Sequence, residues 1–148
     1  MLRRASAWRA WAALAATAAL AACSAMIPVT ISGSLDQPTA TFGVDPTASA
    51  KACLSGLEVQ EVSDVARAVW SISATQRECR PLRRVVFGQA PEGFAAVVPA
   101  AGLKPGVRYT VVAHGWTGWP AAVPWRGGGD FVFENGQWRA APSHPSGR

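Results

Sequence analysis

The sequence has little of what catalytic and metal-binding sites commonly use. It holds two histidines in 148 residues, His114 and His144, and three cysteines without a C-x-x-C spacing. A single histidine does not make a zinc site unless thiolates or carboxylates stand at ligand spacing, and none do. There is no G-x-S-x-G sequence, and the glycine run before Asp130 lacks the Gly-Lys-Ser/Thr of a phosphate-binding loop. We therefore expect no enzyme, no metal and no cofactor.

The chain also lacks an apolar run long enough to cross a membrane as a helix, which needs about 20 residues. Its clearest apolar run covers residues 11–20, is interrupted only by Thr17, and follows Arg3, Arg4 and Arg9. A basic start, a short apolar segment and small residues before a cut are typical of a secretory signal peptide. We predict that residues 1–22 are such a peptide and are removed.

The end of this segment reads Leu20-Ala21-Ala22-Cys23. It resembles the lipobox of bacterial lipoproteins, in which the cysteine sulfur is lipidated, the chain is cut before it and the new amine is acylated. The resemblance implies that Cys23 is the first mature residue and a membrane anchor. Several acyl chains such as palmitate hold a protein stably, at roughly 0.8 kcal/mol per buried CH₂. An ordinary signal peptide with a chance cysteine is the alternative.

The residue after the cysteine bears on location. In Gram-negative lipoproteins an Asp there favours retention in the inner membrane, so Ser24 implies the outer membrane, with the protein facing the periplasm.

Removal of residues 1–22 takes three arginines away and leaves 11 Lys and Arg against 9 Asp and Glu. A nucleic-acid partner needs a larger basic footprint than this, and we expect none.

Lipidation of Cys23 leaves two cysteines, Cys53 and Cys79. Two thiols in an oxidising compartment usually pair, so we predict a structural disulfide between them. It would close a loop of 27 residues, counted from Cys53 through Cys79. In the chain-entropy model such a closure stabilises the fold by roughly 3–4 kcal/mol.

The mature chain is short enough for one domain. Residues 23–50 are rich in Ser, Thr, Pro, Gly and Ala, and we predict the lipidated cysteine and a tether there, with an edge strand over residues 26–31 as an option. Residues 51–140 show short runs in which apolar and polar residues alternate, separated by Gly and Pro turns, which indicates a small antiparallel β-sandwich. One helical turn could fall within residues 61–69, and residues 141–148 should form a flexible tail.

The most specific local pattern lies in residues 131–140, "FVFENGQWRA". Asn135 and Gly136 both tolerate the positive φ that a type I′ turn requires, so a two-residue hairpin is predicted. The turn length sets the register and places Phe133 opposite Trp138.

The segment "LKPGVRYTVVA", residues 103–113, resembles the tyrosine corner of fibronectin type III domains. The resemblance implies an immunoglobulin-like sandwich in which the Tyr109 hydroxyl bonds a nearby backbone group. It also implies that Trp70 lies on strand B and "RRVVFG", residues 83–88, on strand C. Only residues 88–102 separate that segment from Leu103, which leaves room for one strand instead of two.

Residues 114–130, "HGWTGWPAAVPWRGGGD", form the strongest candidate binding segment. A long loop without structure of its own is often functional, and Trp116, Trp119 and Trp125 could stack on sugar rings or anchor a protein partner. Arg126 adds a charge. The structural alternative is that these tryptophans cap the open end of the core.

We therefore expect a lipid-anchored, non-catalytic binding or structural module of the cell envelope that presents this loop to an envelope protein or a glycan. A binder similar to protease inhibitors or chaperones is the second hypothesis, and an enzyme is the third and least favoured.

Overall fold

The computed structural model describes residues 25–43, 52–64, 67–77, 81–117 and 123–142. Within them the chain forms ten strands and one 3₁₀ turn, η1 (Val62–Asp64). The strands are β1 (Ala25–Ile27), β2 (Val29–Gly33), β3 (Pro38–Phe42), β4 (Ala52–Glu61), β5 (Ala68–Ala74), β6 (Arg84–Val86), β7 (Phe94–Val98), β8 (Arg108–Thr117), β9 (Pro124–Glu134) and β10 (Gln137–Ala140).

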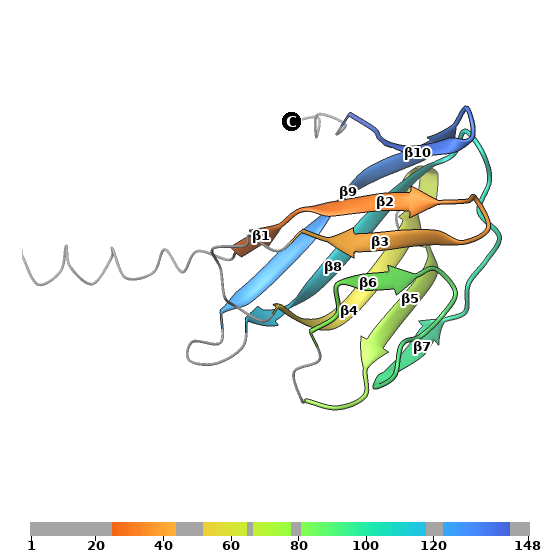
Figure 1. Cartoon of the computed structure of the whole chain (residues 1–148). Coiled ribbons are helices and arrows are strands. Elements are labelled where there is room, and N and C mark those ends of the chain that lie inside the picture. The colour runs from red at the N-terminus through yellow and green to blue at the C-terminus, as the bar shows by residue number, and fades with distance from the viewer. Residues whose placement is uncertain (1–24, 44–51, 65–66, 78–80, 118–122, 143–148) are drawn as a thin grey trace, which may run out of the picture.

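The strands form two sheets packed face to face (Figure 1). The large sheet has the order β1-β9-β8-β4-β5-β7, with β10 added on β9, and the small sheet has the order β2-β3-β6. All pairs are antiparallel except β1, which runs parallel to β9. The predicted antiparallel β-sandwich is therefore confirmed.

The sandwich begins earlier than the composition suggested. Residues 25–42, which were expected to belong largely to a tether, form β1, β2 and β3. Val29 and Phe42 are buried in the core, so the β2–β3 hairpin is an integral part of one sheet. Ser and Thr make this segment resemble a linker, yet burial alternates along β3 as in a strand, with Pro38, Ala40 and Phe42 buried and the threonines between them only partly buried.

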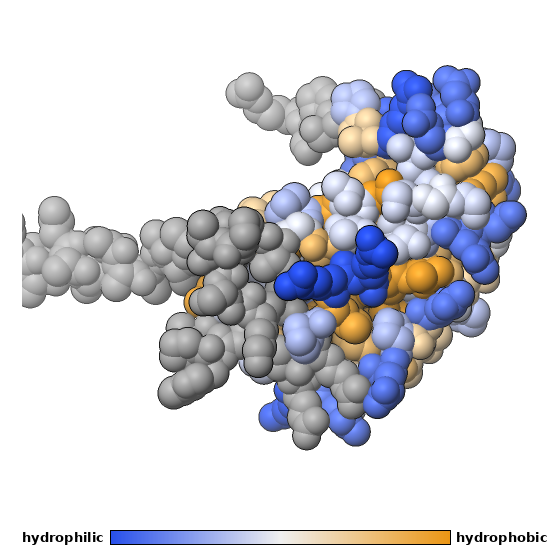
Figure 2. All heavy atoms as spheres, in the orientation of Figure 1, coloured by the Kyte–Doolittle hydropathy of each residue, from blue (hydrophilic) through white to orange (hydrophobic). Residues whose placement is uncertain are grey.

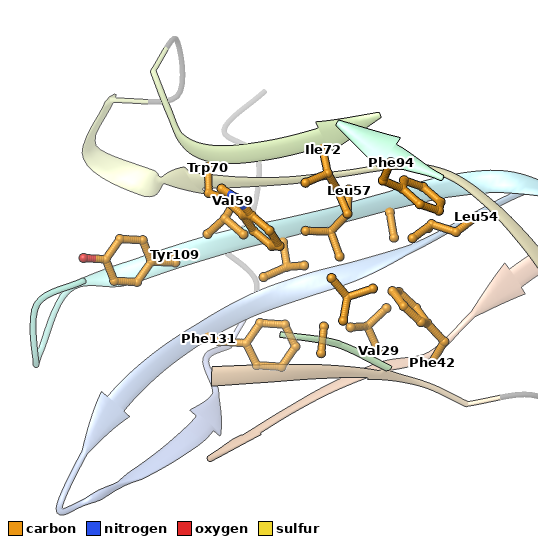
Figure 3. Packing of buried hydrophobic residues seen from close by; sticks show 14 of the residues in the cluster. Val29, Phe42, Leu54, Leu57, Val59, Trp70, Ile72, Phe94, Tyr109 and Phe131 are labelled. Carbon is orange, nitrogen blue, oxygen red and sulfur yellow. The ribbon is translucent and has the colours of Figure 1, made fainter. Parts of the chain in front are cut away.

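The core lies between the two sheets and is apolar throughout (Figure 3). Leu57, Trp70 and Phe131 project from the large sheet toward Val29 and Phe42 of the small one. Because β6 has only three residues, the small sheet does not cover the whole core. Hydrophobic surface therefore shows among hydrophilic residues around β6 (Figure 2).

A gap of about 30 Å³ remains between the sheets, and apolar side chains such as Val85 and Phe87 line it. This is about the room that one water molecule needs, and an apolar lining offers that water no hydrogen bonds. The gap is therefore a packing defect of the core.

Several local predictions are confirmed. Asn135 and Gly136 have φ values of 52° and 76° and join β9 to β10. The register pairs Phe133 with Trp138, whose ring centroids lie 5.3 Å apart. Residues 88–102 hold the single strand β7, and η1 is the expected helical turn.

The strand assignment implied by the fibronectin resemblance does not hold. In immunoglobulin-type sandwiches strands C and F lie in the same sheet. Here β6, which holds three of the six residues of "RRVVFG", lies in the small sheet, and β4 takes the place beside β8. Trp70 is buried as expected, but it lies on β5 in the same sheet as Tyr109. β4 has ten residues and matches the ten of β8, whereas β6 has only three.

Candidate functional site

The candidate binding segment, residues 114–130, is largely strand and not a long loop. β8 continues to Thr117 and β9 starts at Pro124. The Thr117 amide donates to the Val123 carbonyl at 2.8 Å, and the Val123 amide donates to Thr117 Oγ1 at 3.0 Å. Residues 118–122, with Trp119, lie outside the described residues. The hypothesis of a protruding 17-residue loop is therefore wrong.

Trp125 belongs to the core. Its side chain is 1% exposed, and its indole Nε1 donates to the Cys53 carbonyl at 3.1 Å. Its ring meets Phe42 of the small sheet edge-on, with centroids 6.0 Å apart. A side chain so enclosed cannot contact a partner in the folded protein, so the binding role proposed for Trp125 is replaced by a structural one.

Trp116 and Arg126 lie on the outer face of the large sheet. Side chains alternate along a strand, and the inward positions of β8 and β9 are the odd-numbered ones, including Tyr109 and Trp125. The register pairs Trp116 with Pro124, and Arg126 with Met26 of β1. Met26 is 77% exposed, the highest value among the exposed large apolar residues described. We call Met26, Trp116, Pro124 and Arg126 the hairpin-end patch.

The backbone beneath this patch is closely packed. Cys53 is 0% exposed, and its carbonyl lies against Gly115. A Cβ at Gly115 would stand 1.9 Å from that carbonyl oxygen, so only glycine fits here. Cys53 also forms an isolated antiparallel bridge with Pro81. The predicted partner Cys79 lies outside the described residues, and its pairing with Cys53 stays a prediction.

A second candidate site lies at the opposite end of β4 and β8. It is a cleft of about 510 Å³ beside the turn that precedes Tyr109, and we call it the corner cleft. Arg67 and Lys104 are exposed there, and Glu61 is partly buried and accepts a hydrogen bond from Ser63 Oγ at 2.6 Å. Its lining residues are Glu61, Arg67, Ala68, Val69, Val98, Pro99, Ala101, Gly102, Lys104 and Tyr109.

Tyr109 is one of the residues that line the corner cleft, and it has the predicted corner geometry. Its hydroxyl accepts a hydrogen bond from the Lys104 amide at 2.9 Å. Burial raises the pKa of Tyr109 above its ordinary value of 10.0, the Lys104 hydrogen bond opposes this, and the charge of Glu61 raises it further. The hydroxyl is therefore neutral at physiological pH and acts as a structural hydrogen-bonding group.

Sequence reasoning missed the corner cleft. Its lining comes from the end of β4, the start of β5, the end of β7 and the turn before β8, segments that only the folded sheet brings together. Positive charges and a carboxylate near the ends of predicted strands were the available signal. Two cations, one carboxylate and apolar walls suit a ligand that combines anionic or hydroxyl groups with an apolar face, as glycans do.

Over the described ranges, no group of three or more His, Cys, Asp or Glu side chains is placed to hold a metal ion. No helix within the same ranges is long and apolar enough to cross a membrane. In comparisons with known proteins, no family model, no curated protein and no solved structure matches this chain.

Proposed function

We propose that the mature protein is a lipid-anchored lipoprotein of the bacterial cell envelope. It is held in the outer membrane, faces the periplasm, and binds an envelope protein or glycan through its β-sandwich without catalysis. The proposal rests on one observation: the cysteine of the lipobox-like sequence, Cys23, stands two residues before Ala25, where β1 begins. A cut before Cys23 would leave β1 whole, including its pairing with β9.

A disulfide between Cys53 and Cys79 fits the oxidising compartment of this proposal. The bridge between Cys53 and Pro81 holds the chain two residues after Cys79 against β4. Two residues span at most about 7 Å, and disulfides join Cα atoms roughly 4.4–6.8 Å apart. The bridge at Pro81 therefore supports the proposed pairing of Cys53 with Cys79.

The corner cleft is the surface best placed to meet a partner. It lies at the far ends of β4 and β8 from Ala25, so an anchor at Cys23 leaves the cleft facing away from the membrane. The hypothesis of a binder similar to protease inhibitors or chaperones needed a long protruding loop, and the pairing of β8 with β9 removes most of that loop. We therefore assign partner binding to the corner cleft.

The experiment compares wild type with Cys23→Ser and with Ser24→Ala as the matched control, each expressed in a Gram-negative host with labelled palmitate. Wild type and the Ser24 variant should carry label and sediment with outer membrane, whereas Cys23→Ser should be unlabelled and unprocessed or released. The purified wild type is expected to have no free thiol. An unlabelled wild type would contradict the proposal.

The binding part is read in the same cells by crosslinking. Arg67→Glu reverses a charge at the corner cleft, and Arg84→Glu makes the same change on β6, away from it. We expect Arg67→Glu to lose the crosslinked partner and Arg84→Glu to keep it. Equal capture by both variants would remove the cleft from the proposal and leave the anchor standing.

A further inference from the structure

We infer that the hairpin-end patch lies against the bilayer that carries the protein's own lipid anchor. The inference rests on the proposed lipidation of Cys23. It goes further in two respects. It gives the orientation of the sandwich on the membrane, and it identifies the lipid surface as what Met26, Trp116, Pro124 and Arg126 contact.

The first support is the shortness of the connection. Cys23 and Ala25 are two residues apart, and a chain spans at most about 3.6 Å per residue, so the anchor stays within roughly 7 Å of β1. No flexible tether of the expected length can intervene, because residues 25–42 are part of the sandwich.

The second support is the strand register. β1 runs parallel to β9, with Ala25 beside Trp125. Ala25 is therefore level with the start of β9, one residue after Pro124, and the neighbouring Val123 is hydrogen-bonded to Thr117 at the end of β8. Since the anchor stays within roughly 7 Å of β1, it also stays close to this end of the β8–β9 hairpin.

The third support is the chemistry of the patch. Met26 is an exposed apolar side chain, Trp116 is partly exposed, and tryptophan favours the boundary between headgroups and acyl chains. Arg126 is exposed beside Met26, and arginine is attracted to anionic headgroups. The patch residues belong to two rows of cross-strand partners, Met26–Arg126–His114–Gly56 and Pro124–Trp116–Cys53. Neither row contains a carboxylate. Nothing in these rows therefore repels an anionic surface.

The test measures how near each end of one strand lies to lipid. Pro124 and Glu134 are both exposed and stand at opposite ends of β9, roughly 33 Å apart at about 3.3 Å per residue. Pro124→Cys and Glu134→Cys are made in the full chain, purified with their lipid and labelled with a thiol-reactive fluorophore. Parent protein treated identically gives the background. Each is placed in phosphatidylethanolamine and phosphatidylglycerol vesicles, with or without brominated acyl chains.

We expect bromine to quench most of the fluorescence at position 124 and almost none at position 134. A third protein carries Pro124→Cys and ten Gly and Ser residues inserted between Ser24 and Ala25, and its quenching should be largely lost. Equal quenching at both positions in acylated protein would overturn the inference, as would quenching unchanged by the insertion. Mass spectrometry of the same samples reports acylation, so a failure of the anchor itself is distinguished from a failure of the orientation.

Discussion

The two ends of the sandwich are built from the same strands but have opposite character. At the hairpin end, β4 and β8 enclose Cys53 and Trp125, and the backbones approach so closely that Gly115 leaves no room for a methyl group. At the corner end the same two strands reach Glu61 and Tyr109 and open into a cleft with charged rims. One pair of strands therefore combines a closely packed end with a polar recess roughly 25 Å away.

The comparison is tested most strongly at the two described tryptophans of the hairpin end. Trp125→Ala should lower the free energy of unfolding by about 3–5 kcal/mol, because it empties a core site and removes the indole hydrogen bond to the Cys53 carbonyl. Trp116→Ala, on the outer face, should cost less than about 1 kcal/mol. Urea unfolding followed by circular dichroism gives both values. Equal losses of unfolding free energy would mean that Trp116 and Trp125 contribute alike to the packing of this end.

How much of this contrast could be predicted depends on the range of the contacts. The Asn135-Gly136 turn and the Tyr109 corner follow from residues close in sequence. The turn was predicted with its register, and the corner with a hydrogen bond between the Tyr109 hydroxyl and a nearby backbone group. The burial of Trp125 was within reach, since it shares the parity of the buried Phe131, but three glycines between them break the apolar pattern. β1 was harder, because its pairing with β9 joins residues 100 positions apart.

The corner cleft was beyond local reasoning for a similar reason. Four segments line it, and their neighbourhood depends on the order of strands in the large sheet. The resemblance to fibronectin domains placed residues 83–88 beside the Tyr109 strand, and the structure places β4 there. A local motif can therefore be right about a corner and wrong about the sheet in which it lies.

Glycine substitutions sharpen the difference in packing between the ends. Gly115→Ala would bring a Cβ against the Cys53 carbonyl and should cost about 1–3 kcal/mol through overpacking. Gly102→Ala, in the corner cleft, meets nothing within 4 Å and should leave stability unchanged or raise it by up to about 1 kcal/mol. Thermal unfolding of the two variants measures this. A tolerated alanine at position 115 would show that the hairpin end can relax.

The smallest expected effect is at the corner end. Tyr109→Phe removes the hydroxyl that accepts a hydrogen bond from the Lys104 amide, and it should cost about 0.5–1.5 kcal/mol at neutral pH.

Burial raises the pKa of Tyr109 above 10.0, so above that pH the unfolded chain releases its proton before the folded one. The unfolded state then binds fewer protons, and wild-type stability should fall as pH rises from 10.0 toward the folded pKa. Urea unfolding across this range should show the fall in wild type and a weaker one in Tyr109→Phe; parallel curves would mean that Tyr109 titrates alike in both states.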